Sequence, residues 1–248
     1  MSLRAAACGQ SRFNLYYSTT PNACGEDSFF IAENTIGIAD GVGGWNYYGI
    51  SSAAMSQTLM LNCKTLVGAE DAPAKLNLSD PFRVAKLMRA AYQEIVDHDQ
   101  EIVGSTTCCI LSFNPETMMM EAANVGDSGY ILVRNGRVVA ENEFQKNDRD
   151  RPNQIGVAPK NIDISFVCDI DTIETTCFPV YEGDVVVLAT DGLWDNTSKA
   201  KIASVVQECV DDLPVATMAK YIVDLALSSW EKPDDITVVV ATVLCARK

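Results

Sequence analysis

Three carboxylates of the sequence stand at the ends of apolar runs, where they could come together. Asp40 ends one such run and begins a glycine turn, Asp191 follows a second run, and Asp234 shortly precedes the last one. Short apolar runs of this kind predict buried strands. These carboxylates are therefore expected on rigid strand ends, and if the ends converge, mutual repulsion favours bound cations.

The chemistry that such a cluster supports is that of a hard metal ion, because all-oxygen ligands select Mg²⁺ or Mn²⁺. Bases are missing around the acids: no Lys or Arg occurs at 13–63, 90–133 or 161–198, although the last of these segments alone holds eight acids. Taken alone, each acid is more simply a solvated surface or turn residue, and spacing does not show that they converge. Taken together, they favour a metal site.

Charge and hydropathy exclude two classes of partner. The 248 residues carry 19 Lys and Arg against 33 Asp and Glu, a formal net charge of −14. Such a surface repels phosphate backbones and anionic lipid, so we expect no nucleic-acid partner. No run approaches the roughly 18 apolar residues of a transmembrane helix, so we expect no membrane partner.

Histidine and cysteine counts restrict the chemistry further. His98 is the only histidine, which excludes a multi-histidine zinc site and leaves a single candidate base for a catalytic triad. It shares the apolar stripe of a predicted helix, which favours a partly buried structural histidine. Nine cysteines without a C-x-x-C pair indicate reduced thiols, so the protein is expected inside the cell.

The elements that must position the acids belong to one predicted domain, 1–248, without an internal linker. Residues 1–20 are expected to be a poorly ordered lead, 106–139 an antiparallel meander closed by an Asn135-Gly136 hairpin turn, and 141–160 a polar surface flap. Helices grouped around many antiparallel strands predict the α+β class, with helices packed outside a sheet or sandwich. Strands are predicted at 29–32, 36–39, 106–113, 118–125, 130–133, 138–139, 162–167, 185–189 and 236–244, and helices at 51–67, 81–103, 198–210 and 214–230.

Six short sequence blocks occur in order along nearly the whole chain. They read Gly-Glu-Asp-Ser at 25–28, Ala-Asp-Gly-Val-Gly-Gly-Trp at 39–45, Gly-Ser-Thr-Thr at 104–107, Asn-Val-Gly-Asp-Ser at 124–128, Thr-Asp-Gly-Leu-Trp-Asp at 190–195 and Asp-Asp-Ile-Thr at 234–237. The series resembles that of the PP2C-type metal-dependent serine/threonine protein phosphatases. The first two blocks especially resemble the T-cell activation phosphatase-like subgroup, some members of which are mitochondrial.

The resemblance implies a four-layer α/β/β/α fold, an antiparallel β-sandwich flanked by helix pairs, with two Mn²⁺ or Mg²⁺ ions at one end. The implied metal ligands are Glu26, Asp27, Asp40, Gly41, Asp191 and Asp234. Asp40 would bridge both ions, and Asp40, Asp191 and Asp234 are the implied catalytic residues. A third, looser ion in some members would use Asp127 and Asp195.

The implied activity is hydrolysis of phosphoserine or phosphothreonine in a phosphoprotein substrate. Two adjacent metal ions lower the pKa of a bridging water, so that hydroxide attacks phosphorus in line and no covalent intermediate is needed. The same ions offset the charge of an acid cluster that would otherwise repel a phosphate.

Three positions depart from the family pattern. Asn22 stands where many members carry a phosphate-gripping arginine, Val42 replaces a histidine proposed as general acid, and Asp235 replaces an asparagine. Losing a positioned general acid lowers the rate of the chemical step about 10²-fold. The phosphate-binding group is therefore left open, with four candidates by proximity in sequence: Arg134, Arg137, Arg149 and Arg151.

These departures keep an alternative open, a pseudophosphatase or phosphoprotein-binding regulator of low activity. The retained Asp40, Asp191 and Asp234 favour the enzyme, because a pseudoenzyme often loses a ligand. No C-x5-R, G-x-S-x-G or Gly-Lys motif supports another hydrolase or a P-loop, and the Asp-x-Asp at 169–171 lacks the context of an aspartate nucleophile. We expect a monomer in the cytoplasm, and the subgroup resemblance leaves a mitochondrial location open.

Overall fold

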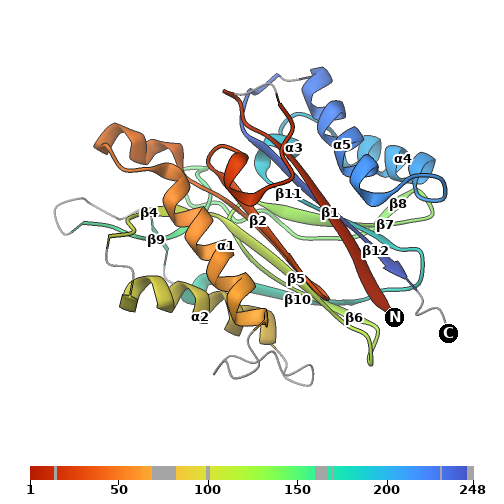
Figure 1. The fold of residues 1–248 in the computed structure, drawn as a ribbon, viewed down its shortest axis with the longest axis horizontal. Coiled ribbons are helices and arrows are strands. Elements are labelled where there is room, and N and C mark those ends of the chain that lie inside the picture. The colour runs from red at the N-terminus through yellow and green to blue at the C-terminus, as the bar shows by residue number, and fades with distance from the viewer. Residues whose placement is uncertain are drawn as a thin grey trace.

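Two five-stranded antiparallel sheets form the centre of the molecule (Figure 1). The computed structural model describes residues 1–13, 16–68, 82–98, 101–159, 167–168, 170–229 and 231–244. The first sheet has the order β1 (Ser2–Gln10), β12 (Ile236–Leu244), β11 (Val185–Ala189), β7 (Gly129–Arg134) and β8 (Arg137–Glu141). The second has the order β10 (Glu174–Pro179), β6 (Met119–Val125), β5 (Cys108–Asn114), β3 (Thr35–Asp40) and β2 (Asp27–Ala32).

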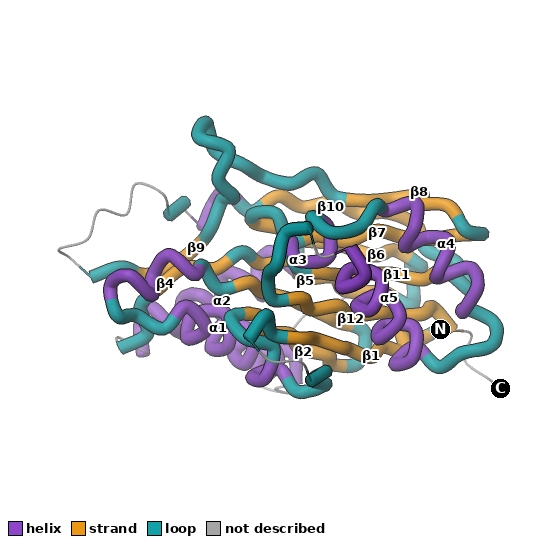
Figure 2. The backbone as a smooth tube through the Cα atoms, turned by 90° about the horizontal axis from the view of Figure 1, so that it is seen from above, coloured by secondary structure: helices purple, strands orange, loops and turns teal. Residues whose placement is uncertain are grey.

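A pair of helices covers the outer face of each sheet (Figure 2). The helices α4 (Lys199–Cys209) and α5 (Val215–Ser229) pack on the first sheet. The helices α1 (Ser52–Gly68) and α2 (Arg83–His98) pack on the second. The predicted four-layer α/β/β/α arrangement is therefore confirmed.

Side-chain alternation along the strands explains why the core has three layers. In β12, Val238 and Val240 face the α4–α5 pair, whereas Val239 and Ala241 face the second sheet. Successive side chains of a strand point to opposite faces, so a strand that is buried on both faces must be apolar at every position. This is why β11 and β12 are recognisable in the sequence as unbroken apolar runs.

Residues 2–10 of the poorly ordered lead expected at 1–20 form a strand. β1 pairs with β12 along its whole length, from Ser2 opposite Leu244 to Gln10 opposite Ile236, as the red and blue arrows in Figure 1 show. Its three consecutive alanines carry little strand propensity. The tertiary pairing with a strong strand decides its conformation.

The predicted meander at 106–139 is wrong in two places. The expected strand at 106–113 breaks at Thr107: β4 (Gly104–Thr106) leaves the main sheet and pairs with β9 (Ile155–Val157), and β5 begins at Cys108. The chain then changes sheets between β6 and β7, at a turn where Gly126 has φ +97°. The Asn135-Gly136 hairpin between β7 and β8 is confirmed, with positive φ at both residues.

Other boundaries differ from the sequence predictions. β10 was not predicted, and the helix expected at 81–103 runs from Arg83 to His98 within the described residues. The strand expected at 162–167 lies outside the described residues except for Val167. The flap at 141–160 is less open than expected, because Asn142, Gln145 and Gln154 are buried in it and its end forms β9.

His98 is not partly buried as expected, since its side chain is 71% exposed and lies 3.8 Å from Glu94. The thiol prediction holds for the eight cysteines that the structure describes, all of which are free. None of the helices in the described part of the chain combines the length and apolar character needed to cross a membrane.

Candidate metal centre

The predicted acidic residues meet in one cavity at the end of the sandwich where β3 ends and β12 begins. The cavity has a volume of about 160 Å³ and is lined by Arg12, Glu26, Asp40, Gly41, Val42, Gly43, Thr107, Asp127, Pro152, Asp191 and Asp234. Asp40 ends β3, Asp191 begins the short helix α3 (Asp191–Trp194) after β11, and Asp234 precedes β12. Both sheets therefore contribute carboxylates to the same cavity.

Close backbone approaches hold these segments against one another. A Cβ atom on Gly41 would lie 2.0 Å from the carbonyl oxygen of Ser52, and one on Gly192 would lie 2.0 Å from that of Asp235. Neither position tolerates a side chain. The glycines that follow Asp40 and Asp191 are thus needed to pack the first turn of α1 and the start of β12 beside the acids.

Burial raises the pKa of the carboxyls at the base of the cavity. The pKa of Asp191 is raised to about 7, first by burial and then by the charges of Asp127, Asp234 and Asp195. Burial, followed by the charge of Asp27, also raises the pKa of Asp40. Several acids in a low-dielectric site cannot all ionise without a compensating cation. Without a cation, the cluster therefore avoids mutual repulsion only while some of its carboxyls hold protons.

Asp27 lies behind the cavity and does not line it. It stands opposite Asp40 in the β2–β3 pair and is fully buried. Thr190 Oγ1 donates a hydrogen bond of 2.9 Å to its Oδ2. Burial, and then the charge of Asp235, raises its pKa. This places Asp27 where it can support Asp40 and Asp191 or reach an ion through its other oxygen.

The donor set fits a hard divalent ion. Oδ1 of Asp27 and Oδ1 of Asp191 are buried and accept no hydrogen bond from the described residues, and buried oxygens without donors are unusual. Within the described residues, no three His, Cys, Asp or Glu side chains are grouped closely enough to form a ready metal cage. The acids that line the cavity offer carboxylate oxygens, which are the donors that Mg²⁺ and Mn²⁺ prefer.

Arg12 was missed by sequence reasoning and lies at the cavity. Its Nη1 donates to Asp234 Oδ1 at 2.5 Å and its Nη2 donates to Glu26 Oε2 at 2.8 Å. Its side chain is 25% exposed. Burial alone lowers the pKa of Arg12, but the charges of Glu26, Asp234 and Asp235 outweigh that effect and raise it. A cation thus already spans two of the predicted metal ligands.

Glu26 is held by the loop and helix that follow Asp40. Its Oε1 accepts hydrogen bonds from Asn46 Nδ2 at 2.8 Å and from Ser52 Oγ at 2.5 Å. Its carbonyl oxygen accepts one from Ser56 Oγ at 2.6 Å. The orientation of this carboxylate is therefore fixed before any ion or substrate binds.

Asp235, the residue that departs from the family's asparagine, organises the N-terminal side of the site. It is 2% exposed. Its Oδ1 accepts a hydrogen bond from the backbone N of Arg12, and its Oδ2 accepts one from that of Glu26, both at 2.7 Å. This extra acid therefore acts as a backbone clamp: its two carboxylate oxygens join the backbone at Arg12 to the backbone at Glu26.

The two residues predicted for a third ion, Asp127 and Asp195, have different surroundings. Asp127 lines the cavity, and burial raises its pKa. Asp195 does not line it, and its carboxylate pairs with Lys232. The hydrogen bond from Lys232 to Asp195 and the charges of Asp191 and Asp127 raise the pKa of Lys232. An ammonium group therefore lies beside the acids that a third ion would use.

None of the four basic residues suggested as phosphate binders lines the metal cavity. Arg134 makes a bidentate pair with Asp184, through Nε and Nη2 at 2.7 Å each, and lies over the ring of Tyr181. Arg137 is the first residue of β8, and Arg149 is exposed in the flap. Arg151 lines a neighbouring hollow but not the metal cavity, whereas Val42 and Pro152 line both.

Comparisons with known proteins agree with this geometry. The profile of the family described as Stage II sporulation protein E (SpoIIE) matches residues 34–244. The protein phosphatase PTC7 homolog fig of Drosophila willistoni is 35% identical over 272 residues, covering 95% of this chain and 82% of that protein. The chain belongs to the PP2C family of protein phosphatases. Assignment of this PP2C phosphatase to the T-cell activation phosphatase-like subgroup is not supported, because the relatives are named PTC7 homologues.

Solved structures of PP2C phosphatases share the fold. The photosystem II phosphatase PBCP aligns with a TM-score of 0.77 at 23% identity, over 97% of this chain and 98% of that one. The catalytic domain of the serine/threonine protein phosphatase PstP, solved with two manganese ions, aligns with a TM-score of 0.66 at 23% identity, over 98% and 99% of the two chains. The sandwich and its helix pairs are therefore those of the family.

Proposed function

We propose that this PP2C phosphatase hydrolyses phosphoserine and phosphothreonine in proteins with a water activated by two Mn²⁺ or Mg²⁺ ions. The observation that carries the proposal is the cavity in which carboxylates from both sheets converge. The names of the relatives and the two manganese ions of PstP support it.

The proposed ligands are the residues that the motifs predicted. Asp40 would contact both ions, Gly41 would contribute its carbonyl oxygen, Glu26 and Asp27 would serve one ion or its water, and Asp191 and Asp234 would hold the other. When bound, two such ions offset the charge of the carboxylates and lower the pKa of a bridging water. Asn46 and Ser52 keep the Glu26 carboxylate in place during this chemistry.

Arg12 is proposed as the residue that binds the substrate phosphate. It would take the role of the arginine that many family members carry at the position of Asn22. Among the described residues that line the cavity, it is the one cation. Its guanidinium presents planar paired donors that match phosphate oxygens. Bound ions would neutralise its present partners, Glu26 and Asp234, and a phosphate would then offer it new acceptors. Asp235 holds its backbone beside the site throughout.

A third ion is proposed to bind only weakly. Asp127 and Asp195 remain its candidate ligands, but Lys232 already pairs with Asp195. An incoming cation would have to displace this ammonium group. The alternative of a pseudophosphatase is not favoured, since the chain keeps the motif acids and its relatives are named as phosphatases.

We infer a reducing compartment within the cell from the thiols: the eight cysteines of the described residues are free, and six of these are buried. We also propose that the protein acts as a monomer, in which the residues of one chain are enough to complete the proposed metal site.

The test of the proposed function is phosphate release from a phosphothreonine peptide. We expect release only with added Mn²⁺ or Mg²⁺, and none from Asp191→Ala. The exposed acid Asp211 provides a matched control, since Asp211→Ala removes the same charge away from the cavity and should keep full activity. Activity that survives EDTA, or no activity with any metal, would overturn the proposal.

A further inference from the structure

A second and larger hollow adjoins the metal cavity. It has a volume of about 560 Å³ and is lined by Val42, Gly44, Trp45, Tyr47, Tyr48, Arg151, Pro152 and Gln154. Val42 and Pro152 line the metal cavity as well, so the two hollows share a wall. We call this hollow the aromatic groove. Its volume is within the range of about 300–1,000 Å³ that is typical of ligand sites.

The walls of the aromatic groove are fixed by buried hydrogen bonds. Trp45 is 2% exposed, and its Nε1 donates to Ser105 Oγ at 2.6 Å. Ser105 Oγ in turn donates to Gln154 Oε1. These bonds join the 3-10 helix Gly43–Tyr48 to the facing segment that leads into β9, and β9 pairs with β4. A site that is already ordered loses little conformational freedom on binding.

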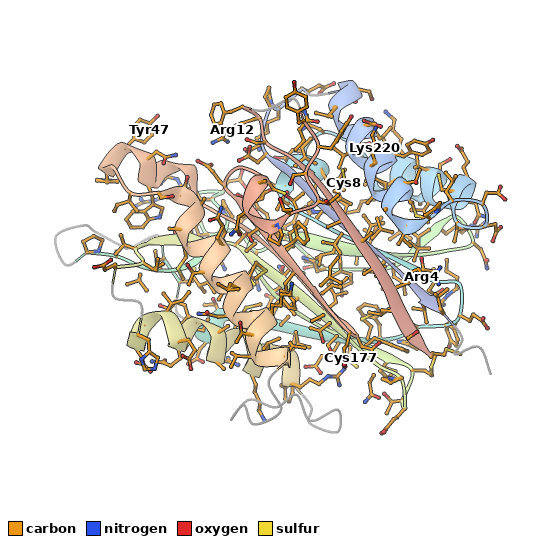
Figure 3. The ribbon with its side chains drawn as sticks, viewed as in Figure 1. Arg4, Cys8, Arg12, Tyr47, Cys177 and Lys220 are labelled. Carbon is orange, nitrogen blue, oxygen red and sulfur yellow. The ribbon has the colours of Figure 1, made fainter. Side chains whose placement is uncertain are left out.

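The rim of the aromatic groove exposes large aromatic side chains. Tyr47 is 93% exposed and Tyr48 is 61% exposed. Figure 3 shows Tyr47 at the same end of the molecule as Arg12. Aromatic side chains combine a large apolar surface with low conformational entropy and are enriched in binding sites. Arg151, on the facing wall, adds a positive charge to this end of a protein whose net charge is −14.

We propose that the aromatic groove binds the substrate segment next to the phosphorylated residue and selects an aromatic or large aliphatic side chain within two positions of it. The inference rests on the proposed function, which seats the phosphate in the metal cavity. Consecutive residues of an extended chain advance about 3.3–3.6 Å each. A neighbour of the phosphorylated residue therefore reaches the adjoining hollow, where its apolar side chain meets Val42, Tyr47 and Tyr48.

The test uses phosphothreonine peptides with a Gly and Ala background and a single Phe, Leu or Ser at each position from −2 to +2. With Mn²⁺ present, we expect kcat/KM to be roughly 10-fold or more higher for Phe or Leu than for Ser at one of these positions, through a lower KM. This factor corresponds to the burial of one apolar side chain.

The decisive variant fills the aromatic groove. A Cβ on Gly44 meets no atom within 4 Å, and the residue has no positive φ, so Gly44→Leu should fold and should remove the preference for Phe and Leu. Gly68→Leu is the matched control, because Gly68 at the end of α1 is equally open and lies outside the aromatic groove; it should keep the preference. Tyr47→Ser, a change at an almost fully exposed side chain, should reduce the preference about threefold.

The possible outcomes distinguish failure of the groove inference from failure of the proposed phosphatase function. If the unaltered protein hydrolyses all the peptides at equal rates, the groove inference is wrong and the phosphatase proposal stands. If Gly44→Leu or Tyr47→Ser keeps the full preference, the selecting contacts lie elsewhere and the groove inference is again wrong. If no peptide is hydrolysed with any metal, the proposed function fails, and with it the inference that rests on it.

Discussion

The pKa of Asp191 predicts that the metal-free protein loses stability as the pH rises. Burial first, and then neighbouring acids, raise that pKa from 3.8 to about 7. Between these values the native carboxyl holds a proton that the unfolded chain has released, so the free energy of unfolding falls with rising pH. A shift of about 3 units corresponds to a loss of up to about 4 kcal/mol, complete once the pH exceeds about 7. The raised pKa values of Asp27 and Asp40 act in the same direction.

The assay is urea unfolding in EDTA at pH 5 and pH 7.5, with Asp191→Asn as the perturbation. The amide keeps the shape of the side chain and cannot ionise. We therefore expect Asp191→Asn to be more stable than the unaltered protein at pH 7.5, by about 1–4 kcal/mol, and to show a weaker pH dependence. Excess Mn²⁺ should reverse the order, because it stabilises only the protein that binds it. Asp211→Asn, at an exposed site, should behave like the unaltered protein.

The reasoning would be refuted by either of two results. One is a metal-free stability that stays level or rises between pH 5 and pH 7.5. The other is an Asp191→Asn variant that is less stable than the unaltered protein at pH 7.5 yet gains as much from Mn²⁺. Either result would mean that the ionised Asp191 carboxylate is not destabilised by its surroundings in the absence of a cation.

Three further predictions follow from the same cavity. Arg12→Ala should lower kcat/KM for a phosphopeptide about 10- to 100-fold, the value of a charge-assisted phosphate contact. Mn²⁺ binding, measured by calorimetry, should become tighter because a competing cation is gone. Unchanged kinetics would contradict the phosphate role. Val42→His should add a new ionisation to the pH profile of kcat, and an unaltered profile would argue against a leaving-group role at this position. Asp235→Asn should lower the free energy of unfolding, measured in urea, by about 1–2 kcal/mol. The side-chain amide has one acceptor oxygen, so only one of the two backbone N–H groups, that of Arg12 or that of Glu26, keeps its acceptor. Equal stability would show that these two hydrogen bonds are unimportant.

The strand ends that carry the acids could be predicted because they are encoded locally. β11 and β12 are buried on both faces, and unbroken apolar runs mark them; Asp191 and Asp234 stand at their ends. The sequence alone supports only a hypothesis that the acids share a cavity, since this depends on how the two sheets meet. Their roles as ligands stay a prediction.

Arg12 could not be predicted from local sequence, because its partner Asp234 lies 222 positions away. One signal existed: Arg12 is the last base before the base-free stretch 13–63, and it is the base closest in sequence to Glu26. The same dependence on distant partners hid β1, whose alanines become a strand only beside β12. It also hid the change of sheet at Gly126, since each hairpin is locally regular.

The most direct test of the central claim is a crystal structure of the protein grown with Mn²⁺, with anomalous scattering used to place the metal. We predict two manganese peaks about 3.5–4 Å apart, both touching Asp40, with Asp191 and Asp234 on one of them. A structure with Mn²⁺ in the crystal and no peak in this cavity, or with peaks bound only elsewhere, would contradict the account.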